Sequence, residues 1–97
     1  LNLEIFTSTC WGAIYEKGDY SKIHSHFPSL LSWVYYVKVT EKSSPIIFRD
    51  GYSYQPKTGY GIIFPSYVYH EVPIEKYGQR IVIAGNVELD YFKTIEK

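Results

Sequence analysis

Short apolar runs separated by turn-forming residues are the feature that most restricts how this chain can fold. The segments between the runs contain Gly, Pro, Ser, Asn or Asp, and the runs are rich in Tyr, Val, Ile and Phe. These residue types suit half-buried strands, and the spacing is typical of an all-β sandwich or barrel. The predicted strands are Leu1–Phe6, Cys10–Glu16, Ser32–Thr40, Pro45–Phe48, Gly59–Phe64, His70–Val72 and Gln79–Val87.

Helical periodicity is absent before the last ten residues, so the fold is predicted to be all-β. Strands of this number and length close either as an immunoglobulin-like sandwich or as a jelly roll, also called a double-stranded β-helix. The 97 residues supply material for one hydrophobic core. We therefore expect one domain over residues 1–97. Because the chain begins at Leu1 rather than Met, the sequence leaves room for an upstream segment.

Charge and cysteine content limit the partners and the compartment. Lys and Arg together number 10, as do Asp and Glu, so no long-range field steers the chain toward nucleic acid or an anionic membrane. No apolar run approaches the roughly 20 residues that span a bilayer, and no signal peptide is recognisable. Cys10, the single cysteine, fits a reducing compartment such as the cytoplasm. A homodimer is compatible with this composition.

The three histidines of the sequence occur in two places, His24-Ser25-His26 and His70. Residues two apart in a strand point to the same face, so His24 and His26 can converge on one ion. A third histidine from a distant strand completes a facial set that leaves positions open for substrate and dioxygen, as in non-heme Fe(II) enzymes. The competing interpretation is three ordinary half-buried histidines. The combined pattern favours a metal site at His24, His26 and His70, and we expect that Ni or Zn could replace Fe(II) in a crystal.

Arg80 is the second candidate site residue. The alternation of its segment places Arg80, Val82, Ala84 and Asn86 on one face, which we predict to be the inner one. A buried guanidinium needs an anion, and its planar fork suits a carboxylate. A dicarboxylate co-substrate on the metal would supply that anion. Pairing with a local acid, Glu71 or Glu75, is the equally weighted alternative.

Several blocks in order carry a family resemblance. They are Trp11 to Tyr20, His24-Ser25-His26, Leu31 to Val37, Gly61 to Ser66, His70, and Arg80 to Asn86. This series resembles the 2-oxoglutarate/Fe(II) oxygenase family of marine bacteria and phages, whose blocks are W-x-N, K-G-D, H-x-H-P, L-S-G-V-Y-Y, G-x-L-x-x-F-P-S, H and E-R-x-S-I-x-x-N. The resemblance implies a jelly-roll core like that of prolyl hydroxylases, in the cytoplasm of a bacterium or of a phage-infected host.

The resemblance also implies roles for individual residues. Fe(II) would lie at the histidines, and Arg80 would bind the distal carboxylate of 2-oxoglutarate as co-substrate. Tyr36 or Tyr15 would add a hydroxyl to that carboxylate, although packing roles are the alternative for both. Asn86 would line the same pocket. The target would be a small molecule or a peptide.

Two departures from the family pattern lie near the site. His26 stands where better-known members of the wider superfamily carry a carboxylate, which leaves more positive charge on the metal. Trp33 replaces a small glycine, and it either narrows the substrate pocket or fills core volume.

Two other functions compete with the oxygenase. The spacing of Gly18 before His24-Ser25-His26, and of Pro65 before His70, also resembles the two cupin motifs. A cupin-type dioxygenase would bind its substrate directly on the metal and would not need 2-oxoglutarate. A non-catalytic binding module is the third alternative, because 11 tyrosines suit a carbohydrate or protein surface.

Overall fold

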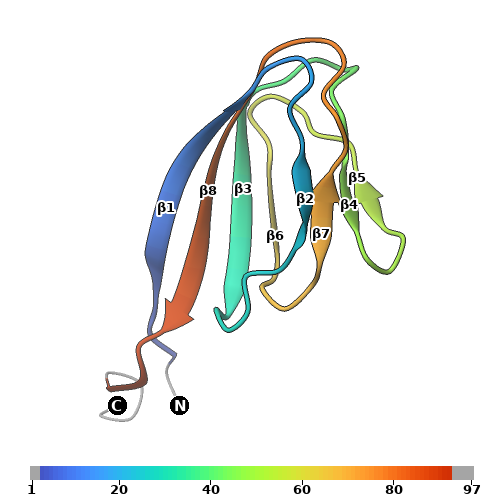
Figure 1. The fold of residues 1–97 in the computed structure, drawn as a ribbon. Helices are drawn as coiled ribbons and strands as arrows, with labels where there is room; N and C mark the ends of the chain where they lie inside the picture. Colours follow the sequence, from blue (N-terminus) through green and yellow to red (C-terminus); the bar gives the residue numbers. More distant parts are fainter. Residues whose placement is uncertain (1–2, 93–97) are drawn as a thin grey trace.

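Two four-stranded sheets face each other in the computed structural model, which describes residues 3–92 (Figure 1). The strands are β1 (Ile5–Tyr15), β2 (Ser21–His24), β3 (Leu31–Lys38), β4 (Ile46–Phe48), β5 (Ser53–Tyr54), β6 (Gly61–Pro65), β7 (His70–Val72) and β8 (Arg80–Leu89). One sheet has the order β1-β8-β3-β6 and the other the order β2-β7-β4-β5. All the strand pairs are antiparallel. This arrangement confirms the predicted all-β jelly roll.

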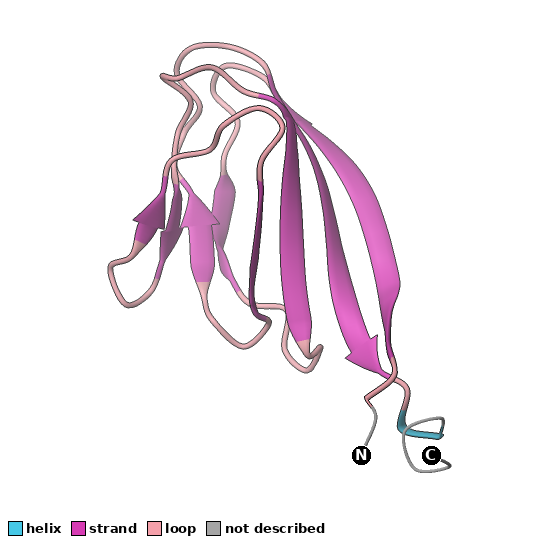
Figure 2. Ribbon diagram, turned by 180° about the vertical axis from the view of Figure 1, so that it is seen from behind, coloured by secondary structure: helices cyan, strands magenta, loops and turns pink. Residues whose placement is uncertain are grey.

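The strands predicted from Ser32–Thr40 onward correspond to β3, β4, β6, β7 and β8, with ends that differ by at most two residues. Seen from behind, strands and loops make up nearly all of the described chain (Figure 2). No helix within residues 3–92 is long and apolar enough to cross a membrane.

The first two predicted strands were wrong as separate elements. Ile5 and Phe6 of the first predicted strand and Cys10–Tyr15 of the second belong to the single strand β1. Leu3, Glu4 and Glu16 lie outside β1, and Leu1 and Asn2 lie outside the described part. The pairing of β1 with β8 shifts register between Thr7 and Thr9, so one extra residue is accommodated without ending the strand. Strands β2 and β5 were not predicted, because they are too short for alternation to be recognised.

The space between the sheets holds both apolar and polar side chains. Arg80, Val82 and Ala84 are buried on the inner face of β8, as the alternation predicted, and Asn86 is half-buried. The apolar core consists of Tyr36, Ile46, Phe64, Val72, Val82 and Ala84, while His70, Arg80, Glu75, Ser32, Ser43 and Ser66 are buried polar residues. Buried polar groups are costly unless they are satisfied, so their number points to a function inside the barrel.

Candidate active site

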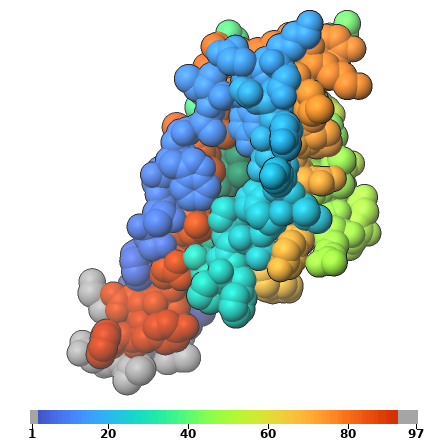
Figure 3. All heavy atoms as spheres, viewed as in Figure 1, coloured from blue at the N-terminus to red at the C-terminus, as the bar shows by residue number. Residues whose placement is uncertain are grey.

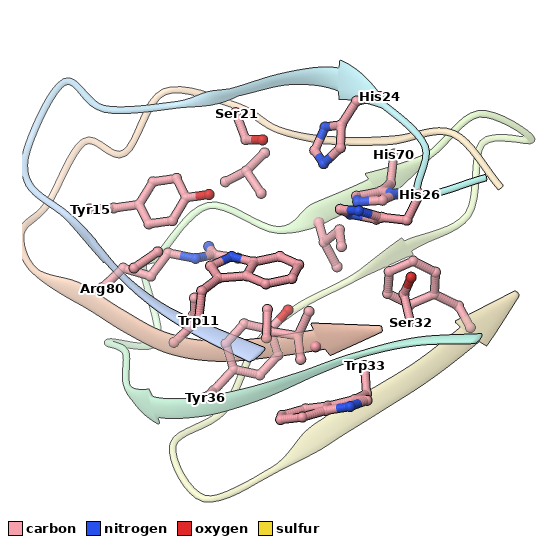
Figure 4. Close-up of a pocket in the computed structure, with 18 residues that line it drawn as sticks. Trp11, Tyr15, Ser21, His24, His26, Ser32, Trp33, Tyr36, His70 and Arg80 are labelled. Carbon is pink, nitrogen blue, oxygen red and sulfur yellow. The ribbon is translucent and has the colours of Figure 1, made fainter. Parts of the chain in front are cut away.

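Three imidazole rings meet between the sheets (Figure 4). His24 ends β2, His70 begins β7, and the two residues are partners across these strands. Each histidine offers one ring nitrogen, and these atoms all lie within 4.8 Å of one another. Small ring rotations would bring the three nitrogens to the distance of about 2 Å from one ion that metal–imidazole bonds require.

Backbone carbonyls fix the tautomer of two of these rings. His24 Nδ1 lies 2.6 Å from the carbonyl oxygen of Lys22, and His70 Nδ1 lies 3.1 Å from that of Val68. A carbonyl oxygen only accepts, so both Nδ1 atoms carry the proton and donate it. Each Nε2 then keeps a free lone pair, which is how neighbouring hydrogen bonds prepare histidines for a metal.

Burial favours the neutral form of two of the three histidines, His26 and His70. Desolvation lowers the pKa of His70 to about 4, helped by repulsion from the two other histidines and opposed by the Val68 carbonyl. Desolvation, with His24 as a second cause, also lowers the pKa of His26. Neutral imidazole is the ligand form, so metal ions need not displace protons from these two rings at neutral pH.

His26 reaches the cluster by a different route from the one predicted. Convergence of His24 and His26 was predicted from the two-residue period of a strand, although no strand was assigned to this segment. In the structure β2 ends at His24, and His26 lies beyond it, where the next turn begins. The His26 N–H donates to the Ser66 carbonyl at 2.9 Å, and the His26 carbonyl accepts from the Ser29 N–H at 3.0 Å. These two bonds direct the ring inward, 4.9 Å from His24 and 5.2 Å from His70 between centroids.

A cavity of about 120 Å³ extends from the histidines toward Arg80. Its walls come from both sheets and include Trp11, Tyr15, Ser21, Ser32, Tyr36, Phe64, Val82 and Ala84. Figure 3 shows a recess between the atoms of β1 and those of β2. The histidine cluster and the buried arginine therefore line one space, with β1 and β2 on either side of its opening.

Arg80 is buried at the end of this cavity, with 2% of its surface exposed. Its Nη1 donates to the carbonyl oxygen of Ser44, while Nε has no hydrogen-bond partner in the part of the chain that the structure describes. The guanidinium carbon lies 5.5 Å from the centroid of the Tyr15 ring and 5.4 Å from that of Tyr36. Both rings offer cation–π contacts. Within residues 3–92, Arg80 forms no ion pair with Glu71 or Glu75. The alternative prediction, that Arg80 pairs with one of these acids, is therefore wrong.

Tyr36 presents a second unpartnered polar atom to the cavity. Its side chain is fully buried, and its hydroxyl oxygen lacks a hydrogen-bond partner among the described residues. Burial raises the pKa of Tyr36 to about 12, and the charge and N–H groups of the neighbouring Arg80 oppose this rise, although no N–H of Arg80 lies in hydrogen-bond geometry with the hydroxyl. The hydroxyl therefore stays protonated and is a donor. A carboxylate between Tyr36 and Arg80 would satisfy both groups.

Two other predicted site residues have different positions. Tyr15 lines the cavity beside Arg80. Asn86 does not line it: the Asn86 side-chain oxygen accepts from Ser32 at 2.8 Å, and its nitrogen donates to Thr9 at 3.1 Å. The alternation that placed Asn86 inside was right, but these hydrogen bonds hold it behind Ser32.

Two contributions to the site were not recognised in the sequence. Trp11 lines the cavity with its ring centroid 5.7 Å from that of His26. A tryptophan in a strand-like segment is equally typical of ordinary core packing, so the sequence could not show that Trp11 lies beside the histidines. Ser44 contributes its main-chain carbonyl to Arg80, and main-chain contacts leave no signature in residue type.

Comparisons with solved structures support the fold. The chain is similar to an oxidoreductase of the 2OG-Fe(II) oxygenase family from Burkholderia pseudomallei, with a TM-score of 0.81, 16% identity and coverage of 91% of this chain and 47% of that one. It is also similar to the viral collagen prolyl hydroxylase of Paramecium bursaria Chlorella virus-1, with a TM-score of 0.71, 17% identity and coverage of 87% and 60%. An RmlC-like cupin from Desulfovibrio desulfuricans matches with a TM-score of 0.63, 10% identity and coverage of 87% and 80%.

No protein-family model matches the sequence, and neither does any curated protein. The chain spans about half the length of the oxygenases it resembles, and most of the length of the cupin. At these identities the similarity establishes the fold. The resemblance to 2-oxoglutarate/Fe(II) oxygenases and prolyl hydroxylases that the sequence motifs predicted holds at this level.

Proposed function

We propose that this chain carries the catalytic core of a 2-oxoglutarate- and Fe(II)-dependent oxygenase of the hydroxylase type. His24, His26 and His70 would hold the metal, and Arg80 with Tyr36 would bind the distal carboxylate of 2-oxoglutarate. One observation carries the proposal: a single cavity combines three converging imidazoles with two buried polar atoms, Tyr36 Oη and Arg80 Nε, that have no hydrogen-bond partner among residues 3–92.

The chain's own residues would bind, orient and exclude water. Arg80 supplies positive charge in a position where Tyr15 and Tyr36 flank the guanidinium, and Tyr36 supplies a hydroxyl proton. The apolar side chains of Phe64 and Val82 line the space between these groups and the histidines. When bound, Fe(II) supplies dioxygen activation, in which one oxygen atom converts 2-oxoglutarate to succinate and CO₂ and the other enters a C–H bond of the target.

Anaerobic titration tests this assignment. Fe(II) together with 2-oxoglutarate should give a visible metal-to-ligand charge-transfer band with the wild-type chain. Arg80→Ala should weaken 2-oxoglutarate binding by at least tenfold, because a charge-assisted hydrogen bond to a buried carboxylate contributes about 1.5–3 kcal/mol. His70→Ala should abolish the band. Arg49→Ala is the matched control, because Arg49 is the other arginine and is exposed.

A cupin-type dioxygenase is the second candidate, and His26 is the observation that favours it. Three neutral imidazoles leave the full charge of the metal uncompensated, whereas a carboxylate would reduce it. The same titration separates the two functions. Fe(II) binding without a 2-oxoglutarate band would favour the cupin-type reaction, and a folded protein that binds no Fe(II), Ni(II) or Zn(II) would favour a non-catalytic binding module.

A further inference from the structure

The free edge of β1 is unusually open for strand addition. β1 is the first strand in the order β1-β8-β3-β6, so among the described residues only one of its sides is paired. Its residues, Ile5–Tyr15, include no Asp, Glu, Lys, Arg or Pro, and nearly all are exposed. Proteins usually protect a long strand edge with charges, proline or short length. β1 has a bulge near Ser8, but from Thr9 to Tyr15 it has neither a charged residue nor a proline.

Hydrogen bonds elsewhere in the sheet indicate which backbone groups face this edge. The Tyr36 N–H donates to Tyr60, and the Tyr36 carbonyl accepts from Gly59, so Tyr36 faces β6 and not β8. Its partner Val82 must then face β1 and pair with Ala13, because backbone groups alternate along antiparallel strands. The N–H and C=O groups of Cys10, Gly12 and Ile14 consequently point to the free edge.

The residues of β1 that alternate with these edge-facing ones line the cavity, so the free edge lies next to it. Trp11, Ala13 and Tyr15 bond to β8 and line the cavity with their side chains. A strand added to β1 would lie about 4.8 Å away, with every second side chain on the same inner side. Such a side chain beside Trp11 would enter the recess between β1 and β2, next to the His26 ring (Figures 3 and 4).

We propose that the target is an extended, largely uncharged polypeptide segment that binds as an added strand along the free edge of β1. Backbone hydrogen bonds to Cys10, Gly12 and Ile14 would hold the segment, and one inward side chain would pass Trp11 to reach the metal ligands. Lack of charge along β1 favours an uncharged segment. This inference rests on the proposed oxygenase function and names the class of its substrate.

The experiment uses 12-residue peptides selected by display on the Zn(II)-loaded chain, which cannot turn over, and then resynthesised. Binding should slow amide exchange at Cys10, Gly12 and Ile14 more than at the residues between them. The amides of an added strand face β1 at every second residue. N-methylation of that alternating set of peptide amides should abolish binding, and N-methylation of the other set should leave binding unchanged. Ile14→Pro should weaken binding at least tenfold, since proline removes an edge donor without breaking the β1–β8 ladder.

Ile63→Pro is the matched control. Ile63 lies on β6, the opposite edge of the same sheet, and the alternation turns its backbone groups outward in the same way. Both isoleucines are largely exposed, Ile14 at 60% and Ile63 at 72%. Equal loss of binding in the two variants, or exchange protection outside β1, would overturn the proposal. Concentration-dependent protection of β1 in the peptide-free protein would identify a second copy as the occupant instead.

Turnover separates this inference from the function on which it rests. With Fe(II), 2-oxoglutarate and dioxygen, the selected peptide should gain one oxygen atom at a residue that faces the cavity, and mass spectrometry would locate it. If the peptide binds along β1 but is not oxidised and no charge-transfer band forms, the proposed oxygenase function is contradicted and the proposed peptide-binding edge stands. If a peptide is oxidised but does not change amide exchange in β1, the proposed peptide-binding edge is contradicted and the proposed oxygenase function stands.

Discussion

At the scale of single residues, the site is defined by polar groups that the fold buries without satisfying. A buried hydroxyl without a partner costs about 1–3 kcal/mol, and a buried cation costs more unless it is paired. Tyr36 is fully buried and Arg80 nearly so, and each keeps one unpartnered polar atom. Residues selected only for stability would not keep this arrangement, so these atoms are best explained by a ligand.

Tyr36→Phe should therefore have effects of opposite sign with and without co-substrate. In the ligand-free protein, loss of the unpartnered hydroxyl should raise the free energy of unfolding by up to about 1 kcal/mol, measured in urea. In the Fe(II) complex, the loss of a donor should weaken 2-oxoglutarate binding by about two- to tenfold, measured by the charge-transfer titration. A variant that binds 2-oxoglutarate as tightly as wild type would remove Tyr36 from the site.

At the scale of strands, a tryptophan and a glycine set the contact between β3 and β8. Trp33 and Gly85 are partners across these strands, and a Cβ at Gly85 would lie 2.5 Å from two carbons of the indole. No real Cβ contact is that short. Trp33 stands where the family motif has a glycine. Its indole fills the space beside Gly85 on β8, which is open only because Gly85 has no side chain.

Gly85→Ala should destabilise the protein by about 1–3 kcal/mol, because the new methyl group overlaps an aromatic ring held in the sheet. In the Trp33→Ala background the same change should cost less than about 0.5 kcal/mol, since the overlap is gone. Urea unfolding of the four proteins in this cycle measures both values. Gly12→Ala is the control, because its Cβ would meet only the Val82 carbonyl oxygen at 3.8 Å.

At the scale of the whole molecule, the jelly roll brings all three histidines into a desolvated interior. His70 has 5% of its surface exposed, and burial is the main reason that its pKa falls to about 4. A group that titrates at a lower pH in the folded state than in the unfolded state links the global stability of the protein to pH.

The metal-free protein should lose stability as the pH falls from about 6.5 to about 4. In this window the unfolded chain takes up a proton at His70 and the folded protein does not, so protonation favours unfolding. The loss from this residue should reach at most about 3 kcal/mol. Urea unfolding across this range, with chelator present, measures it. His70→Gln should flatten the curve, and an unchanged slope in this variant would assign the pH dependence to other groups.

Particular residues explain how much could be predicted. Strands β3 and β8 were found from sequence because eight or more residues of β-branched and aromatic character leave a clear alternation. β2 and β5 have four and two residues, too few for any period. The histidine cluster was predicted correctly as a group, but the reason given for His26 was wrong, because its orientation depends on a hydrogen bond to Ser66, 40 positions further along the chain.

The sequence by itself determined the all-β class, the inner face of β8 and the residue types available for a metal and a carboxylate, because alternation and side-chain chemistry are local properties. Only the tertiary structure decided that Asn86 is held behind Ser32, that the Ser44 carbonyl holds Arg80, and that Trp11 lies beside His26. Within residues 3–92, it also leaves one edge of β1 without a partner strand, next to the cavity. These features depend on contacts between distant segments and on backbone groups that every residue shares, so no local pattern can encode them.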